Sequence, residues 1–240
     1  MNTIAFTKKG NIKMIAHRGL SGLERENTCP AFVAAGVKSY YGIETDVHVT
    51  ADGKFIVIHD DDLKRVANVD MSVEGSTFET LRAVRFTDTD GVTKRNDLFL
   101  PTVEEYVAIC RKYGKQCVLE LKNRMKTEKV WELVAVVKDM GWFSHTTFIS
   151  FSAENLLDIR KKYPDADAQF LTGDSSEKTL RFLIENGIDA DFWEGCITKE
   201  VVDFLHTAGR TVNCYTIDTM QSAENMLAAG VDYITTDILE

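Results

Sequence analysis

The feature of this 240-residue sequence that most restricts its fold is a regular alternation of helix and strand patterns after residue 100. Thr102 and Glu105 have the spacing of a capping box, which predicts the start of a helix that continues to about residue 113. A short apolar segment at residues 116–121 predicts a strand. Residues 126–140 then show an apolar stripe with helical spacing, and the same succession repeats to the end of the chain.

Two further segments nearer the N-terminus bring the number of expected parallel strands to eight. The eight cover residues 11–16, 43–50, 116–121, 146–150, 168–171, 188–192, 210–216 and 232–236. The first helix is expected to be capped by Asn27 or Thr28, with Pro30 in its first turn, and to end at Gly36. Strands that alternate with helices in this number predict an α/β fold, a (β/α)₈ TIM barrel formed by residues 1–240 as one domain.

A doubly wound open sheet is the alternative fold for the same succession of elements. In such a sheet the first strand is typically followed by a glycine-rich phosphate loop with the pattern G-x-G-x-x-G. The first expected strand here runs into His17-Arg18-Gly19 followed by Leu-Ser-Gly, which does not match that pattern. The sequence therefore favours the barrel.

Residues 43–50 alternate between β-branched and polar side chains, which predicts a strand whose polar face carries two carboxylates. Asp52-Gly53 is a strong hairpin signal, and the return strand ends at His59. A two-residue loop would place Asp46 opposite His59, whereas a three-residue loop with a bulge would shift the pairing by about one place. Either register brings the carboxylates and the imidazole together.

A small insertion is expected after the second barrel strand, at about residues 60–100. This segment is polar and shows no clear helix or strand period, so irregular structure is expected. Proline, glycine and serine are not enriched in it, which distinguishes it from a flexible linker.

Charged side chains fall repeatedly at the ends of the expected strands, where TIM barrels carry their active groups. These residues are His17 and Arg18 after the first strand, Glu44 and Asp46 on the second, His59 after the hairpin, and Glu120 and Lys122 at the third. Charges scattered over a surface would not coincide with strand ends so consistently. The sequence therefore predicts an active site at this end of the barrel.

The charges of this group indicate a metal site for an anionic substrate. Glu44, Asp46 and Glu120 contribute three negative charges, and Arg18 and Lys122 contribute two positive charges. A divalent cation would change the net charge from −1 to +1, which suits a singly charged phosphodiester. Carboxylate oxygens prefer hard cations, so Mg²⁺ or Ca²⁺ is expected.

His17 and His59 flank the expected metal site and can serve as general acid and general base near neutral pH. They come from different strands, so they can act on opposite sides of a reacting phosphorus atom. Arg18 and Lys122 are expected to bind nonbridging phosphate oxygens. A third histidine, His48, lies on the carboxylate face and is expected to be hydrogen-bonded beside the site or exposed.

Several short motifs, in this order, resemble those of the glycerophosphodiester phosphodiesterase family, relatives of the phosphatidylinositol-specific phospholipase C barrels. The motifs are His17-Arg18-Gly19, Glu26-Asn27-Thr28, Glu44-Thr45-Asp46, Thr50-Ala51-Asp52-Gly53, His59-Asp60, Pro101-Thr102, Glu120-Leu121-Lys122, Ser150-Phe151, and Gly230-Val231-Asp232 through Thr236-Asp237. Two positions depart from the family pattern. Arg25 stands where proline is usual, and Tyr215 stands where tryptophan is common.

The resemblance implies hydrolysis of glycerophosphodiesters to glycerol 3-phosphate and an alcohol. It implies that His17 and His59 are the acid–base pair, that Glu44, Asp46 and Glu120 bind the metal, and that Arg18, Lys122, Phe151 and Tyr215 contact substrate. In the family, the first attack is assigned to a glycerol hydroxyl of the substrate, and water then opens the cyclic phosphate. Tyr215 can still stack against glycerol but adds a hydroxyl group.

Two other functions are compatible with the same residues. One is a phosphodiester lyase of the sphingomyelinase D type, which releases a cyclic phosphate as its end product. The other is a non-catalytic barrel that binds phosphate esters, although the presence of both histidines and all three carboxylates argues against it. Either way, the expected partner is a small molecule.

Composition limits the other partners and the compartment. The net charge of −9 argues against a general nucleic-acid or membrane-surface binder, and no apolar run is long enough to insert into a membrane. Five cysteines, without a Cys-x-x-Cys pair, indicate reduced thiols and a cytoplasmic location. A homodimer is compatible with the sequence.

Overall fold

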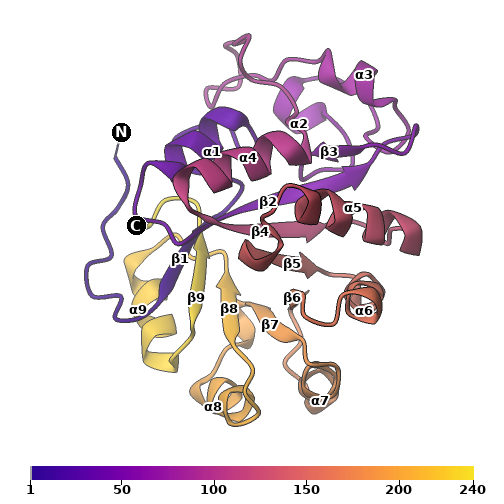
Figure 1. Ribbon diagram of the computed structural model, residues 1–240. Coiled ribbons are helices and arrows are strands. Elements are labelled where there is room, and N and C mark those ends of the chain that lie inside the picture. Colours follow the sequence, from indigo (N-terminus) through magenta and orange to yellow (C-terminus); the bar gives the residue numbers. More distant parts are fainter. Residues whose placement is uncertain (1) are drawn as a thin grey trace.

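The computed structural model describes residues 2–240, and its parallel strands form a closed barrel (Figure 1). The barrel strands are β1 (Lys13–Ala16), β2 (Gly42–Val49), β4 (Gln116–Leu121), β5 (Thr146–Ser150), β6 (Asp167–Thr172), β7 (Asp189–Trp193), β8 (Val212–Tyr215) and β9 (Tyr233–Thr236). Neighbours in the barrel pair in this order, and β1 pairs with both β9 and β2, so the sheet closes on itself. The predicted TIM barrel is confirmed, and the open sheet is excluded.

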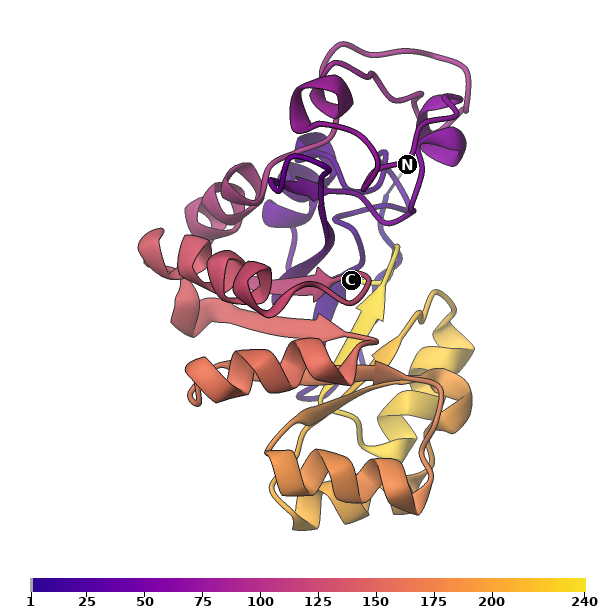
Figure 2. The same cartoon turned by 90° about the vertical axis from the view of Figure 1, so that its right-hand side faces the viewer.

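Helices cover the outside of the barrel (Figures 1 and 2). They are α1 (Cys29–Gly36), α4 (Val103–Tyr113), α5 (Thr127–Asp139), α6 (Ala153–Lys162), α7 (Glu177–Asn186), α8 (Lys199–Thr207) and α9 (Met220–Ala229), with the short 3₁₀ turns η1 (Phe143–His145) and η2 (Glu194–Cys196). The predicted capping box of Thr102 and Glu105 is present at the start of α4. Within residues 2–240, no helix has the length and apolar character needed to cross a membrane.

The hairpin that follows β2 has a three-residue loop. β3 (Phe55–Val57) pairs antiparallel with β2, with Val47 opposite Val57, and the Ile58 N–H donates to the Asp46 carbonyl at 3.1 Å. The prediction of a two-residue loop, which would have placed Asp46 opposite His59, is therefore wrong. The alternative, a three-residue loop that shifts the strand pairing by one residue, is confirmed. The physical reason is Gly53, whose φ of +75° supplies the left-handed residue that closes a three-residue loop.

Residues 60–100 are more ordered than expected. They contain two short helices, α2 (Lys64–Ala67) and α3 (Phe78–Arg82). With the end of the hairpin they enclose a separate apolar core, which consists of Ile56, Ile58, Leu63, Val66, Ala67, Val73, Leu81, Phe86, Leu98 and Leu100. The expectation of irregular structure was wrong in this respect, because helices of one turn are too short to produce a recognisable period.

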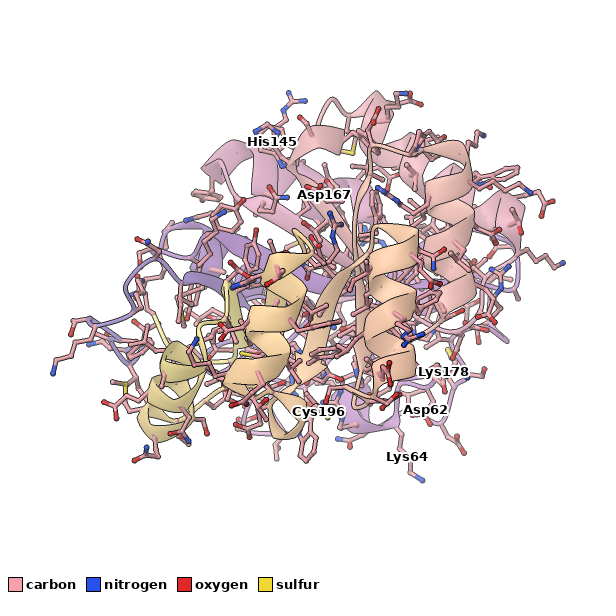
Figure 3. The ribbon with its side chains drawn as sticks, turned by 90° about the horizontal axis from the view of Figure 1, so that it is seen from below. Asp62, Lys64, His145, Asp167, Lys178 and Cys196 are labelled. Carbon is pink, nitrogen blue, oxygen red and sulfur yellow. The ribbon has the colours of Figure 1, made fainter. Side chains whose placement is uncertain are left out.

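The insertion lies at the C-terminal ends of the barrel strands. Figure 3 shows the insertion residues Asp62 and Lys64 at the same edge of the molecule as Cys196, which follows the end of β7. His145 and Asp167, which mark the N-terminal ends of β5 and β6, lie toward the opposite edge. The insertion therefore borders the barrel mouth, the side on which TIM barrels place their active groups.

Candidate active site

The loop after β1 begins with His17-Arg18-Gly19 and adopts a left-handed backbone at two successive residues. Arg18 has a φ of +54°, and its backbone N–H donates to Glu44 Oε2 at 2.7 Å. Gly19 has a φ of +79°, and a Cβ there would lie 2.7 Å from the carbonyl carbon of Ala31. Only glycine fits this close approach to α1, so the local sequence fixes the loop in a position that binds Glu44.

Three carboxylates converge at the barrel mouth. Glu44 and Asp46 lie two residues apart on β2, so they face the same side, and Asp46 pairs in register with Glu120 on β4. Each offers an oxygen within 4.8 Å of the others. Their exposed fractions are 2%, 1% and 6%, respectively. The three residues predicted to bind metal are therefore buried together.

Two cationic side chains partly balance these carboxylates. Lys122 Nζ lies 2.8 Å from Glu120 Oε1 and 3.4 Å from Asp46 Oδ1. Arg18 Nε lies 3.7 Å from Asp46 Oδ2. The cluster thus combines three acidic and two basic groups, the set expected from the sequence.

Glu26 and Asn27, which precede the first helix, contact residues of the site. Asn27 donates from Nδ2 to Asp46 Oδ2 at 2.7 Å, and Glu26 accepts from Arg18 Nη1 at 2.8 Å. The side chain of Thr28 caps α1 instead. The motif therefore orients one carboxylate predicted to bind metal, Asp46, and one arginine predicted to bind phosphate, Arg18.

Electrostatic repulsion among the carboxylates leaves the cluster suited to a cation. Burial and the nearby Asp46 raise the pKa of Glu44 well above its usual value and the pKa of Glu120 to about 7. Although burial opposes ionisation, Lys122 and Arg18 hold the pKa of Asp46 below its usual value. Within residues 2–240, Asp46 Oδ1 has no hydrogen-bond partner. A divalent cation would satisfy this oxygen and remove the need for protons on the other two groups.

Each of the two predicted catalytic histidines is oriented by a carboxylate. His17 Nδ1 lies 2.7 Å from Asp237 Oδ1, and His59 Nδ1 lies 2.7 Å from Asp60 Oδ1. A carboxylate partner keeps the proton on Nδ1, so Nε2 is left to exchange a proton with a bound molecule. Burial, together with the charges of nearby basic residues, lowers the pKa of His59.

A cavity of about 220 Å³ joins these groups. Its lining residues are His17, Arg18, Glu44, His59, Glu120, Ile149, Phe151, Leu171, Asp191, Tyr215, Thr216 and Thr235. Phe151 and Tyr215 meet edge to face with ring centroids 6.1 Å apart. Seven of the nine residues predicted for the site line this cavity, and the ion pairs described above connect the other two, Asp46 and Lys122, to it.

His48 is fully buried and hydrogen-bonded, which matches one of the two roles expected for it. Its Nδ1 lies 3.1 Å from Glu74 Oε1 and its Nε2 lies 3.3 Å from the carbonyl oxygen of His59. It therefore attaches the insertion to the end of the hairpin and does not line the cavity.

Sequence reasoning missed Asp191, a buried carboxyl group on the cavity wall. It is 1% exposed, and its Oδ1 has no hydrogen-bond partner within the described residues. Burial raises its pKa to about 8, so it is neutral at pH 7 and adds no fourth negative charge. The only signal in the sequence was an acidic residue between Ala190 and Phe192, in the middle of a short apolar strand.

The protonated state of Asp191 predicts a specific pH dependence of stability. Between the pKa of an unfolded aspartate, about 4, and about 8 in the folded state, only the folded protein holds this proton. The free energy of unfolding should therefore decrease with rising pH more steeply in the wild type than in Asp191→Asn. The difference between the two slopes should be about 1.4 kcal/mol per pH unit. Denaturant unfolding from pH 5 to pH 8 measures the difference, and parallel curves would show that Asp191 is ionised in the folded protein.

Comparison with known proteins decides the family. The sequence model of the glycerophosphoryl diester phosphodiesterase family matches residues 17–240, which include all the site residues described above. The chain belongs to this family. It is a phosphoric diester hydrolase, a glycerophosphodiester phosphodiesterase, as the resemblance implied.

Individual glycerophosphodiester phosphodiesterases support the assignment in both sequence and fold. A glycerophosphodiester phosphodiesterase of Bacillus altitudinis is 31% identical, with 94% of each chain covered. The structure of one from Parabacteroides distasonis is 28% identical, with a TM-score of 0.75 and coverage of 95% of this chain and 93% of that one. An Oleispira antarctica phosphodiesterase, solved in complex with the product sn-glycerol-3-phosphate, shares the fold with a TM-score of 0.83 at 23% identity, over 94% and 92% of the two chains.

Proposed function

We propose that the protein hydrolyses glycerophosphodiesters to sn-glycerol 3-phosphate and an alcohol in a reaction that requires a divalent metal and both His17 and His59. The observation that carries this proposal is the shared cavity. It is lined by Glu44 and Glu120, by two carboxylate-oriented histidines and by an arginine, and the third carboxylate, Asp46, offers an oxygen within 4.8 Å of the other two carboxylates. A relative with the same fold binds the product named here.

Glu44, Asp46 and Glu120 would hold the metal, Mg²⁺ or Ca²⁺. The donor set consists of hard carboxylate oxygens, and one of them, Asp46 Oδ1, has no hydrogen-bond partner among the described residues. When bound, the cation would offset most of the negative charge of the trio and withdraw charge from a phosphate oxygen. Arg18 and Lys122 would hold the remaining nonbridging oxygens through charge-assisted hydrogen bonds.

His17 and His59 would move the protons of the reaction. Cleavage requires that an attacking hydroxyl group lose a proton and that the leaving alcohol gain one, so two groups in opposite protonation states are needed. In the first step the glycerol hydroxyl of the substrate would transfer its proton to Nε2 of one histidine. Nε2 of the other would protonate the leaving oxygen. Asp237 and Asp60 hold the rings in position for both transfers.

Phe151 and Tyr215 would form the apolar wall against which the carbon chain of glycerol lies. Their rings contact each other at the cavity, beside Ile149 and Leu171.

We also propose a cytoplasmic location, because the five cysteines are all free.

The test of this function is the metal-dependent release of sn-glycerol 3-phosphate from glycerophosphocholine. The expected result is turnover with Mg²⁺ or Ca²⁺, its loss with EDTA, and its return when the metal is restored. A cyclic phosphate that accumulates as the end product would instead establish the lyase reaction. Binding of the substrate without any turnover would support the non-catalytic alternative.

Lys122→Ala is expected to lower kcat/KM by about 10- to 100-fold, the value of one charge-assisted hydrogen bond to phosphate. The same change should tighten metal binding, because it removes a positive charge close to Glu120 and Asp46. Isothermal titration with Mg²⁺ and steady-state kinetics measure the two effects, with Lys122→Arg as the charge-conserving control. An unfolded variant whose folded fraction keeps full activity would make Lys122 a structural residue.

A further inference from the structure

One arginine of the insertion binds two carboxylates that belong to different loops of the barrel mouth. Arg65, on α2, donates from Nε to Asp60 Oδ2 at 2.7 Å and from Nη2 to Asp60 Oδ1 at 3.1 Å. It also donates from Nη2 to Glu26 Oε1 at 2.8 Å and from Nη1 to Glu26 Oε2. Asp60 follows the hairpin, whereas Glu26 lies in the loop after β1.

Each of these carboxylates also holds a residue of the proposed active site. Asp60 Oδ1 lies 2.7 Å from His59 Nδ1, and Glu26 Oε1 accepts from Arg18 Nη1 at 2.8 Å. A continuous chain of contacts therefore runs from His59 to Arg18 through Arg65. We propose that Arg65 is a positioning residue, which fixes Asp60 and Glu26 in the orientations that direct His59 and Arg18 into the cavity.

The electrostatics of the two carboxylates are consistent with this role. Although burial opposes ionisation, hydrogen bonds from Arg65 and His59 lower the pKa of Asp60 to about 2. Arg65 and Arg18 likewise lower the pKa of Glu26, against the effect of burial. Both groups are thus ionised at neutral pH and accept hydrogen bonds only. A planar guanidinium group can bind two carboxylates at once through paired hydrogen bonds, which the single ammonium group of lysine cannot do.

The alternative is that Arg65 only fastens the insertion to the barrel. Arg95 provides a matched control for that role. It also lies in the insertion, and it binds Glu24 of the same β1–α1 loop at 3.2 Å and Asp97 at 2.8 Å. None of its contacts reaches a residue proposed for the site. The side chain of Arg65 is 45% exposed and that of Arg95 33%, so truncation of either leaves the apolar core of the insertion intact.

The inference rests on the proposed function, and the kinetic arm tests it in the metal-loaded full-length enzyme. Arg65→Ala should lower kcat/KM for glycerophosphocholine by about 10- to 100-fold, the usual cost of losing an orienting partner. Both kcat and KM should change, because Asp60 and Glu26, which orient His59 and Arg18, both lose their contacts with Arg65. Arg65→Lys should recover little, whereas guanidinium ion, well below denaturing concentrations, should restore part of the rate of Arg65→Ala. Arg95→Ala should keep wild-type kinetics.

A second arm does not depend on activity. The side-chain NMR resonances of His59, assigned by comparison with His59→Gln, should shift in Arg65→Ala and stay unchanged in Arg95→Ala. If the wild type hydrolyses no glycerophosphodiester, the proposed function fails, but these resonances still test whether Arg65 positions Asp60 and His59. The inference is overturned if Arg65→Ala and Arg95→Ala lose the same amount of activity, in proportion to their decreases in melting temperature. It is also overturned if the His59 resonances are unchanged in Arg65→Ala.

Discussion

Replacement of His17 or His59 by alanine is expected to lower kcat by about 10²–10⁴-fold for either single variant, the usual scale of general acid–base catalysis. Both rings line the same cavity, and each has its Nδ1 occupied by a carboxylate. Neither ring is part of the apolar core, so the loss should appear in turnover while the fold is kept. His145→Ala, on the exposed surface, is the matched control and should have wild-type activity.

The two histidines should behave as one unit. The double variant should lose less activity than the product of the two single losses, because one proton transfer has little value without the other. The wild type should show a bell-shaped pH–rate profile whose two limbs belong to the pair. An activated substrate identifies the histidine that acts first as the acid. The leaving group of a 4-nitrophenyl ester needs little protonation, so this substrate should restore activity to the variant that lacks the acid.

Failure of this rescue would change the assignment. If the activated ester restores neither His17→Ala nor His59→Ala, proton transfer is not the step that was lost. The histidines would then position the substrate or contribute to the metal site.

Loss of a metal-site carboxylate is the second change with a large expected effect. Glu44→Gln, Asp46→Asn and Glu120→Gln should each weaken divalent-cation binding by more than about 100-fold and depress activity accordingly, since in the proposed site they remove a direct ligand rather than an orienting partner. Asp46→Asn should be the most severe, because Asp46 lies within 4 Å of Lys122 and Arg18 and accepts from Asn27. It is the carboxylate kept ionised by its surroundings.

Thermal unfolding gives a readout that does not involve turnover. In the wild type, Mg²⁺ or Ca²⁺ at about 100 times its Kd should add about 2.7 kcal/mol to the free energy of unfolding. All three carboxylate variants should lose this metal-induced gain. Without metal, Glu44→Gln and Glu120→Gln should be at least as stable as the wild type, because repulsion inside the trio is relieved. Asp46→Asn should be less stable than the wild type, because it loses the ion pairs of Asp46 with Lys122 and Arg18. Asp203→Asn, on the outer surface of α8, should keep the full gain. A wild type that retains its rate after thorough chelation would refute the metal proposal.

Local patterns were sufficient for much of the fold. The capping box at Thr102 and Glu105, the two-residue alternation of β2 and the apolar stripe of α5 each depend on residues close in sequence. Their succession therefore predicted the barrel and its boundaries to within a few residues. The hairpin register was left open, because it depends on whether Gly53 adopts a left-handed backbone in a loop of two or three residues.

The principal residues of the site could also be identified from the sequence. A parallel barrel brings the C-terminal ends of its strands to one mouth, so charged residues at those ends had to converge. That rule placed His17, Glu44, Asp46 and Glu120 together before any distance was known. The resemblance to a family of phosphodiesterases then implied the chemistry.

The sequence by itself determined the repeating architecture and the residues that face the barrel mouth, because both follow from short-range periodicity and chain direction. Only the tertiary structure decided which partners orient them. The contacts of Arg65 with Glu26 span 39 positions, and those of His17 with Asp237 span 220. Burial of Asp191 on the cavity wall likewise depends on the closure of the whole sheet. Such contacts depend on how distant loops pack, and no local pattern of residues encodes that packing.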